Sequence, residues 1–343
     1  MIKKLNVGII GLGVGLNHLQ CFIQNKNCRV ISVCDFDEKK IKVIQSKFPK
    51  IKTTLVDNDI TEDKNIDLVC IASYDIYHCD QLITSVKNNK HVFVEKPLCT
   101  NYKEFIKIKE ILKKNPKIRI SSNFILRGAP QFIALNRMIE KKKFGKIFYI
   151  SGEYNYGRLS KIINGWRSNM INYSVTHGGA IHMIDLIIWF LKELPYEVKA
   201  YGNKIVTDKS SFKFNDFSVG ILKFKSGIIA KISSNFGSVT PHHHAFKMFG
   251  TKGTIYSDLR GAMLFKSRNK KAKPKLFKLE TSFQQKTQVI KNFVDNIILK
   301  KDKAIKINFK EIINSMLISL SIEKSIKTKK TIKIDYKNLQ LYE

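Results

Sequence analysis

Short apolar runs alternate with amphipathic stretches over the first 120 or so residues. Five runs rich in β-branched residues have the length and character of buried strands: residues 5–11, 29–35, 66–72, 91–95 and 118–123. The intervening stretches place apolar residues at helical spacing, as Phe105, Ile108 and Leu112 do within residues 101–115. Strand, helix, strand at this rhythm predicts right-handed βαβ units and a doubly wound parallel sheet.

The pattern changes after about residue 124. A helical stretch near residues 130–143 is followed by long β-like runs, and residues 216–237 contain a Lys-Ser-Gly turn between two strand-like halves, which is a hairpin signal. The chain closes with a helix near residues 309–327. We therefore expect an α/β protein of two domains: a doubly wound domain at residues 1–123, and an α+β domain at 124–343 with a mostly antiparallel open sheet. The C-terminal helix is expected to be able to pack back on the first domain.

The formal net charge is +33, which raises the question of nucleic-acid binding. Only eight of the 61 basic residues are arginine, and the lysines are scattered along the whole chain. Base readout and phosphate forks favour arginine, so the charge indicates a lysine-rich composition rather than a nucleic-acid surface. A positive surface of this kind still attracts anionic ligands, nucleotides included.

The cysteines and the apolar runs bear on the compartment. All six cysteines lie in the first 99 residues, and no two are spaced as C-x-x-C, which favours buried thiols in a reducing cytoplasm over a disulfide framework or a zinc ribbon. No stretch approaches the roughly 18 to 20 apolar residues of a membrane span. We expect a cytoplasmic protein without a membrane segment.

The first strand runs into the turn "GIIGLGVGLNH", with Gly11, Gly13 and Gly15 opening a helix. Glycines at such a turn let backbone N–H groups approach a pyrophosphate at the helix N-terminus. The third glycine comes one residue too early for G-x-G-x-x-G. Asp35 ends the second strand 20 residues after Gly15, where a carboxylate can accept the ribose hydroxyls of NAD and repel the 2′-phosphate of NADP. The other interpretation of Asp35 is a helix cap.

The stretch "HVFVEKPL" at residues 91–98 ends a buried strand on Glu95, Lys96 and Pro97. An ionised lysine is costly to bury, so a lysine at the end of such a strand either reaches solvent or lies in a cleft with a chemical task. The residues alone leave both interpretations open.

Taken together, the motifs resemble those of the Gfo/Idh/MocA oxidoreductases. The resemblance covers nearly the whole chain and rests, in order, on "GLGVGLNH", "IASYDIYHCDQ", "VEKPL", "NFILRGAP", "GGAIHMIDLIIWFL", "MFGTKGT" and "SIEKSIKTKKTIKI". It implies an N-terminal Rossmann domain that binds NAD, with NADP possible, and oxidation or reduction at a secondary alcohol of a sugar, cyclitol or nucleotide sugar. It also implies a homodimer or homotetramer.

The same resemblance implies roles for particular residues. Lys96 would lie beside the nicotinamide and hydrogen-bond the reacting hydroxyl, and His182 would be the general base, with Asp185 one turn later in support. Many members carry an aspartate four residues before this histidine, where this chain has Gly178. The neighbouring His177 is a possible substitute.

The remaining site predictions are broader. The cofactor is expected to contact residues of the glycine turn, the strand ends and the domain junction: Gly11, Leu12, Gly13, Val14, Gly15, Asp35, Ser73, His78, Glu95, Lys96 and Arg127. The substrate is expected to contact Trp166, Arg167, His177, Asp185 and His243, the last from the triplet at residues 242–244. A metal site there is not expected, because consecutive strand residues point in different directions.

Two rival hypotheses remain beside the dehydrogenase. The absent aspartate is compatible with a cofactor-binding protein that has no turnover and serves as a sensor or partner subunit. The net charge is compatible with a nucleic-acid binder, which the salt dependence of DNA binding would test.

Overall fold

The structure is a computed structural model that describes residues 4–277, 282–299 and 307–342. The chain divides into two compact units, one formed by Met1–Gly128 with Thr281–Ile313 and the other by Ala129–Glu280 with Asn314–Glu343. The predicted boundary at residue 123 is a single cut, whereas the chain returns to the first unit after residue 280. A change of local pattern cannot show such a return, because it depends on which surface the later helix covers.

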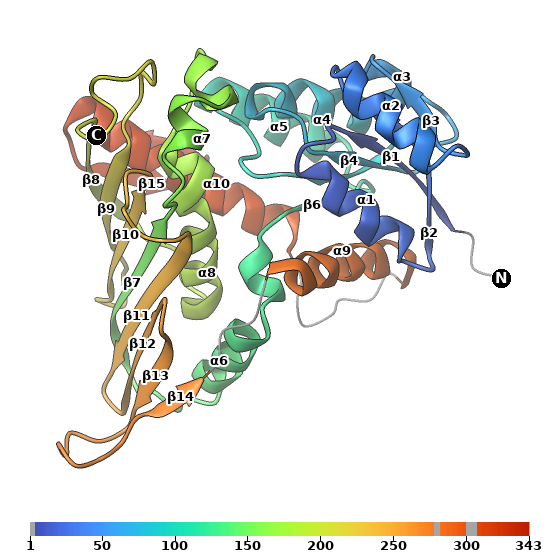
Figure 1. Cartoon of the computed structure of the whole chain (residues 1–343). Helices are drawn as coiled ribbons and strands as arrows, with labels where there is room; N and C mark the ends of the chain where they lie inside the picture. The colour runs from blue at the N-terminus through green and yellow to red at the C-terminus, as the bar shows by residue number, and fades with distance from the viewer. Residues whose placement is uncertain (1–3, 278–281, 300–306, 343) are drawn as a thin grey trace. The chain divides into compact units, whose positions relative to one another are not determined.

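The first unit is built on a six-stranded sheet in the order β3-β2-β1-β4-β5-β6, and all five pairings are parallel (Figure 1). The strands are β1 (Leu5–Ile10), β2 (Cys28–Cys34), β3 (Lys52–Thr54), β4 (Leu68–Ile71), β5 (His91–Val94) and β6 (Ile120–Ser122). The predicted doubly wound parallel sheet is confirmed. The apolar pattern does not predict β3, because none of its three residues is buried.

Helices and short helical turns connect these strands. They are α1 (Gly15–Ile23), α2 (Glu38–Lys47), α3 (Asn58–Thr61), α4 (His78–Lys87) and α5 (Tyr102–Lys114), with the 3₁₀ turns η1 (Asp75–Tyr77) and η2 (Ile125–Gly128). The later helix α9 (Ser282–Leu299) packs on α1 and η2. The strand order reverses between β1 and β4, and ligands of doubly wound sheets bind at the carboxyl ends of strands beside such a reversal.

The second unit is built on a ten-stranded sheet in the order β14-β13-β12-β11-β7-β10-β9-β8-β15-β16. Its strands are β7 (Ile147–Asn155), β8 (Glu197–Asn203), β9 (Phe217–Lys223), β10 (Ile229–Asn235), β11 (His243–Gly250), β12 (Gly253–Asp258), β13 (Gly261–Phe265), β14 (Lys275–Phe277), β15 (Ile332–Asp335) and β16 (Gln340–Tyr342). Only the pairing of β7 with β10 is parallel, so the predicted mostly antiparallel sheet is confirmed. The predicted hairpin is β9 and β10, with Gly227 in the turn at φ 87°.

One face of this sheet carries the helices of the second unit. They are α6 (Pro130–Glu140), α7 (Ser160–Ile163), the 3₁₀ turn η3 (Trp166–Asn169), the π-helical turn η4 (Thr176–Ala180), α8 (Ile181–Leu191) and α10 (Phe309–Thr328), whose first turn belongs to the first unit. Residues 181–190 of α8 are all buried, which is the pattern of a helix covered on every side. A side chain on Gly152 of β7 would collide with Met183, so this glycine lets α8 approach the sheet closely.

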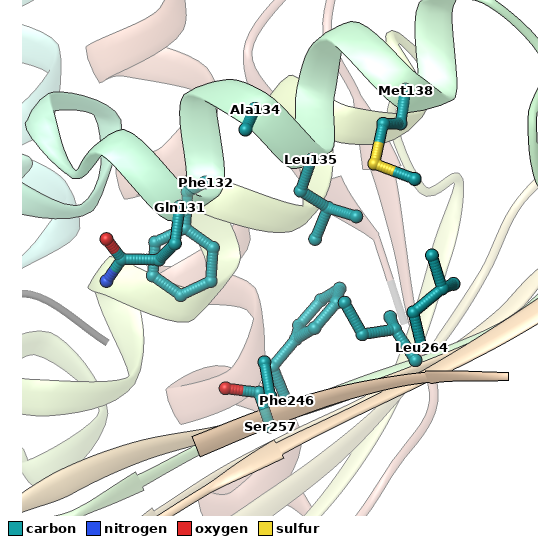
Figure 2. A pocket seen from close by; sticks show the side chains of 10 residues that line it. Gln131, Phe132, Ala134, Leu135, Met138, Phe246, Ser257 and Leu264 are labelled. Atoms are coloured by element: carbon teal, nitrogen blue, oxygen red, sulfur yellow. The ribbon is translucent and has the colours of Figure 1, made fainter. Parts of the chain in front are cut away.

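Helix α6 packs on β11, β12 and β13 through Phe132, Leu135 and Met138, opposite Phe246 and Leu264 (Figure 2). A cavity of about 20 Å³ remains between helix and sheet, which is space for one water molecule. Ligand sites usually measure about 300 to 1,000 Å³, so this packing defect cannot admit a sugar. Among the described helices, none is both long and apolar enough to cross a membrane.

Candidate active site

The glycine turn follows β1 directly and requires glycine at its first position. Gly11 has a φ of 91°, and a Cβ there would collide with the carbonyl of Ala72 at the end of β4. Around Gly13 the space is open, since a Cβ would meet nothing within 4 Å. Gly15 begins α1, whose N-terminal N–H groups and dipole favour an anion. The turn therefore has the open backbone that a pyrophosphate needs, and contact of these glycines with a cofactor stays a prediction.

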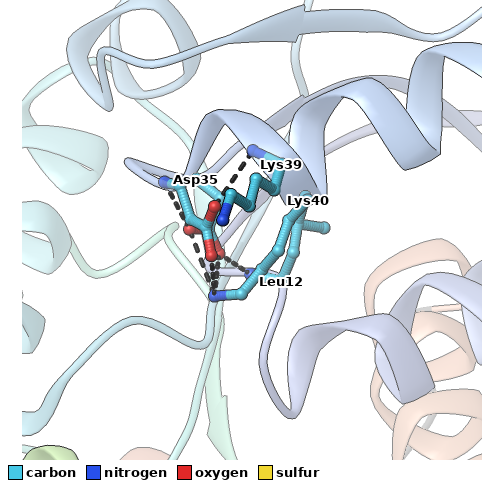
Figure 3. A network of polar contacts seen from close by, with 5 residues as sticks. Leu12, Asp35, Lys39 and Lys40 are labelled. Carbon is cyan, nitrogen blue, oxygen red and sulfur yellow. Dashed lines mark hydrogen bonds and ion pairs between the residues drawn. The ribbon is translucent and has the colours of Figure 1, made fainter.

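Asp35 is the centre of a polar network at the end of β2 (Figure 3). Its carboxylate accepts the backbone N–H of Leu12 at 2.6 Å and that of Asp37 at 2.9 Å, and it is 4% exposed. Lys40 completes the network with its Nζ 3.2 Å from Oδ2. The residue that caps α2 is Asp37, which accepts the N–H of Lys39, so the helix-cap interpretation belongs to Asp37 and not to Asp35.

An aromatic pair, the exposed Phe36 and the half-buried Tyr74, lies next to this carboxylate. Phe36 is 64% exposed, its ring lies 5.5 Å from that of Tyr74, and the Lys40 ammonium is 5.6 Å from its centre. Flat aromatic surfaces of this kind can stack on an adenine ring. Neither Phe36 nor Tyr74 was predicted from the sequence, although their positions within three residues of the ends of β2 and β4 could have indicated them.

Replacing Asp35 by serine is expected to weaken NAD binding and reduce the preference for NAD over NADP, because the ribose would lose an ionised acceptor. A hydrogen bond to a charged group contributes roughly 1.5–3 kcal/mol, so the dissociation constant for NAD should rise about ten- to hundredfold. Calorimetric titration with NAD and NADP measures both constants. Asp37→Ser is the matched control, since serine can still cap α2. Tighter binding of NADP than NAD by the unaltered protein would show that Lys40 or Lys39 outweighs Asp35.

Glu95 is buried at the end of β5, where two side chains donate to its carboxylate. His18 of α1 lies with Nε2 2.8 Å from Oε1, and the amide of Asn123 donates to the same oxygen at 2.6 Å. Burial alone would raise the pKa of Glu95, but the hydrogen bond and charge of His18, the Lys96 charge and the Asn123 bond lower it to about 2. The carboxylate is therefore ionised at neutral pH, directly before Lys96.

Three neighbouring groups shape the loop that carries Lys96. The Lys96 N–H donates to the Glu95 carboxylate at 3.3 Å, and the peptide bond between Lys96 and Pro97 is cis. His78, at the start of α4, has Nδ1 2.7 Å from the carbonyl oxygen of Pro97 and Nε2 3.2 Å from that of Ser73. His78 thus connects the loop that follows β4 with the loop that follows β5. Both His78 and Ser73 are predicted cofactor residues.

Arg127 occupies a different environment from the one expected of a cofactor residue. Its side chain is 1% exposed, and its Nη1 donates to Glu311 in the first turn of α10 at 2.6 Å. This buried ion pair ties η2 to α10 inside the first unit. Contact of Arg127 with the cofactor stays a prediction.

In the second unit, His182 lies in the first turn of α8 and faces an aromatic cluster. Its ring lies 6.1 Å from that of Tyr154 and 5.9 Å from that of His244. His242 continues the group, since its ring is 5.3 Å from His244 and 5.1 Å from Tyr154. Burial raises the pKa of Tyr154, so its hydroxyl stays protonated.

The structure shows which members of the histidine triplet lie beside Tyr154. His243 has Nδ1 2.9 Å from the carbonyl of Pro241 and Nε2 3.2 Å from the Asn155 amide, and its contact with the substrate stays a prediction. The ring of His244 lies beside that of His182, and both His242 and His244 lie beside Tyr154, because alternate residues of a strand point to the same face. The triplet could have indicated this pair, had the register of the strand been known.

His177, Gly178 and Asp185 are all buried. Nδ1 of His177 lies 2.7 Å from the Ser319 hydroxyl of α10, and the Ser315 hydroxyl of the same helix donates to Asp185 at 3.4 Å. A Cβ on Gly178 would collide with the hydroxyl of Tyr173, so this tyrosine fills the space that a side chain at 178 would need. The predicted substrate contacts of His177 and Asp185 stay predictions.

Trp166 and Arg167, the other predicted substrate residues, lie together in η3. The Arg167 guanidinium lies 4.4 Å from the Trp166 ring, and its Nε donates to the Tyr173 hydroxyl at 3.0 Å. It also lies 5.7 Å from the ring of Tyr156, which follows β7. Across the described residues, no group of three histidine, cysteine or acidic side chains could hold a metal ion.

Comparison with known proteins agrees with the geometry. A family model described as "Oxidoreductase family, NAD-binding Rossmann fold" matches residues 5–124, and one described as "GFO/IDH/MocA C-terminal domain" matches residues 132–256. Myo-inositol 2-dehydrogenase of Thermotoga maritima is 23% identical over 342 residues, which cover 96% of this chain and 99% of that protein.

Two solved structures have the same fold. Myo-inositol 2-dehydrogenase from Lactobacillus plantarum has a TM-score of 0.83 at 20% identity, covering 97% of this chain and 100% of that one. Scyllo-inositol dehydrogenase from Lactobacillus casei, with bound NAD(H) and scyllo-inositol, has a TM-score of 0.80 at 16% identity, covering 96% and 99%. The first unit here is accordingly an NAD-binding Rossmann domain.

Proposed function

The chain belongs to the Gfo/Idh/MocA oxidoreductase family, and we propose that it moves a hydride between NAD and a secondary alcohol or ketone of a sugar, cyclitol or nucleotide sugar. The observation that carries the proposal is the arrangement of charged residues directly after β5. A glutamate held ionised by His18 and Asn123 precedes Lys96 at the carboxyl edge of the parallel sheet, which is where ligands of such sheets react.

The first unit supplies the residues that would hold the cofactor. Gly13 and the N-terminus of α1 leave room for the pyrophosphate, and Asp35 offers its carboxylate to the adenosine ribose. NAD, when bound, accepts the hydride at the nicotinamide ring. Exclusion of a 2′-phosphate by Asp35 supports NAD over NADP.

Two side chains of this protein account for the proton. Oxidation removes a hydride from carbon and a proton from oxygen, and the proton needs an acceptor. Lys96 would hydrogen-bond the reacting oxygen, and His182 would take the proton as general base, as imidazoles do near neutral pH. Tyr154 packs on His182, with the two ring centres 6.1 Å apart. In the reductive direction the same groups return the proton.

A panel of cyclitols, sugars and nucleotide sugars, assayed with NAD by the absorbance of NADH, tests the proposal. At least one ring polyol should be oxidised at a rate that depends on enzyme concentration. Binding of NAD by calorimetry is measured in parallel. NAD binding without turnover of any member, and without reduction of the matching ketones by NADH, would favour the sensor hypothesis instead.

The face of the ten-stranded sheet that lacks helices supports a homo-oligomer. Tyr201, Ile221 and Ile229 are exposed by 64%, 40% and 45% on β8, β9 and β10. Their strand pairing puts them on one face, while Ala200, Leu222 and Ala230 on the other face are buried. Lys199, Lys223 and Lys231 lie between these apolar side chains on the same face. Large apolar side chains exposed together on one sheet face favour an interface.

The double substitution Tyr201→Lys and Ile221→Lys is expected to shift the protein to a smaller assembly, because lysines would face each other across a symmetric contact. Sedimentation velocity measures the mass of both proteins at equal concentration. Val239→Lys is the control, since Val239 is fully exposed outside the sheet. An unchanged mass in the double variant would place the contact elsewhere.

A further inference from the structure

Two arginines of the second unit lie over the same tyrosine. The guanidinium carbon of Arg158 is 5.6 Å from the centre of the Tyr156 ring, and that of Arg167 is 5.7 Å from it. Tyr156 is buried and follows β7, while Arg158 comes two residues later and is exposed. The cluster therefore brings two permanent positive charges to one aromatic surface.

This surface is continuous with the surroundings of His182. The Tyr156 ring lies 5.7 Å from that of His242 and 6.0 Å from that of Tyr154, which in turn packs on His182. The positive charges of Arg167 and Arg158 also reach Tyr154, where they oppose the burial that raises its pKa. Contacts through Tyr156 and Tyr154 therefore connect the two guanidinium groups to His182.

The two arginines are arranged differently. Arg167 stacks on Trp166 and donates from Nε to Tyr173, which fixes the plane of its guanidinium. Stacking engages the faces of the group, whereas its N–H donors point outward within the plane. Within the part of the chain that the structure describes, no carboxylate lies within ion-pair distance of Arg158.

We infer that the substrate is a ring polyol that carries an anionic group, a carboxylate or a phosphate ester, and that Arg158 and Arg167 bind this group while the ring faces His182. The inference rests on the proposed dehydrogenase function and narrows its substrate class. Guanidinium forks match the oxygens of both groups, and the net charge of +33 draws anions to the surface.

Steady-state kinetics with three probes test this. D-glucuronate carries a carboxylate, glucose 6-phosphate carries a phosphate ester, and myo-inositol is neutral. With saturating NAD, at least one anionic probe should have a kcat/KM about tenfold or more above that of myo-inositol, the scale of one charge-assisted hydrogen bond. The probe that prevails decides between carboxylate and phosphate.

Arg158→Gln should raise the KM for the preferred anion about tenfold and leave its kcat nearly unchanged, because the contact lies away from the reacting carbon. Its kinetics with neutral probes should not change. Arg167→Lys, which keeps the charge and removes the fork, should show a smaller rise. Arg268→Gln is the matched control, an equal loss of charge in an exposed segment of the same unit. Calorimetric binding of each anion to the NAD-loaded protein gives a readout that does not need turnover.

Failure of this inference is distinguishable from failure of the proposed function. Efficient turnover of myo-inositol, together with no effect of Arg158→Gln on any probe, would overturn the anionic substrate and leave the dehydrogenase intact. Anion binding that Arg158→Gln weakens, without turnover of any probe, would support the anion site and count against the dehydrogenase. No calorimetric binding of either anion to the NAD-loaded protein would overturn the inference directly.

Discussion

Replacing Lys96 by methionine is expected to lower kcat by about 10²-fold or more, the scale of lost acid–base assistance, and to leave NAD binding nearly unchanged. Methionine keeps a long unbranched side chain and removes the ammonium group. The end of β5 should not be disturbed, because the hydrogen bonds from His18 and Asn123 go to the carboxylate of Glu95 and not to Lys96. Initial rates of NADH formation, calorimetric NAD binding and the melting temperature measure the three quantities.

Two further substitutions separate proton transfer from simple positive charge. Lys96→Arg keeps the charge, but arginine cannot lose its proton, so a slow enzyme is expected if Lys96 holds or relays a proton. Lys87→Met removes an exposed lysine at the end of α4 and should have wild-type rates. Wild-type turnover in Lys96→Met would end the catalytic assignment of Lys96.

His182→Asn is expected to slow turnover by roughly 10²- to 10⁴-fold and to remove from the pH profile of kcat/KM the ionisation that a histidine base produces. Asparagine keeps a polar side chain of smaller size beside Tyr154. The profile, measured for the unaltered protein and the variant over the stable pH range, gives the decision. A profile that keeps this ionisation in His182→Asn would move the base to another residue.

His177 is the natural comparison. It lies in η4, directly before α8, and could take the role of the aspartate that many family members carry where this chain has Gly178. The structure directs its Nδ1 to Ser319 of α10, so His177→Asn should retain most of the wild-type kcat. The double variant should then be as slow as His182→Asn alone. Two slow single variants and a double variant barely slower than either would indicate one shared relay, since residues that act as a unit are not additive.

Much of the first unit was predictable because each feature depends on residues close together in sequence. Apolar runs at the expected spacing indicate β1, β2, β4, β5 and β6, and helical periodicity indicates α5. Gly11 could be predicted because the turn requires glycine, and Asp35 could be predicted from its position directly after β2. The short β3 was not predicted, since it forms by pairing with β2 and has no buried residue of its own.

The second unit was predictable in kind but not in detail. Hairpin signals and glycine turns indicate an antiparallel sheet, yet they say nothing of the order in which ten strands pair. The histidine triplet shows the consequence. The sequence indicates that its side chains alternate between the two faces of a strand, but not which face points toward His182. The pairing of β11 with β7 sets that face and brings His242 and His244 to Tyr154.

The sequence by itself determined the doubly wound sheet and the glycine turn, since these follow from local periodicity and one contiguous motif. The roles expected of Lys96 and His182 came from the resemblance of their motifs to those of the family. Only the tertiary structure decided which distant groups meet: His18 with Glu95 across 77 positions, Arg127 with Glu311 across 184, and Tyr173 in the space beside Gly178. Local sequence preferences determine each helix and strand, but burial determines which of them interact. A buried charge or hydroxyl needs a hydrogen-bond partner, and that partner comes from the element that packs against it.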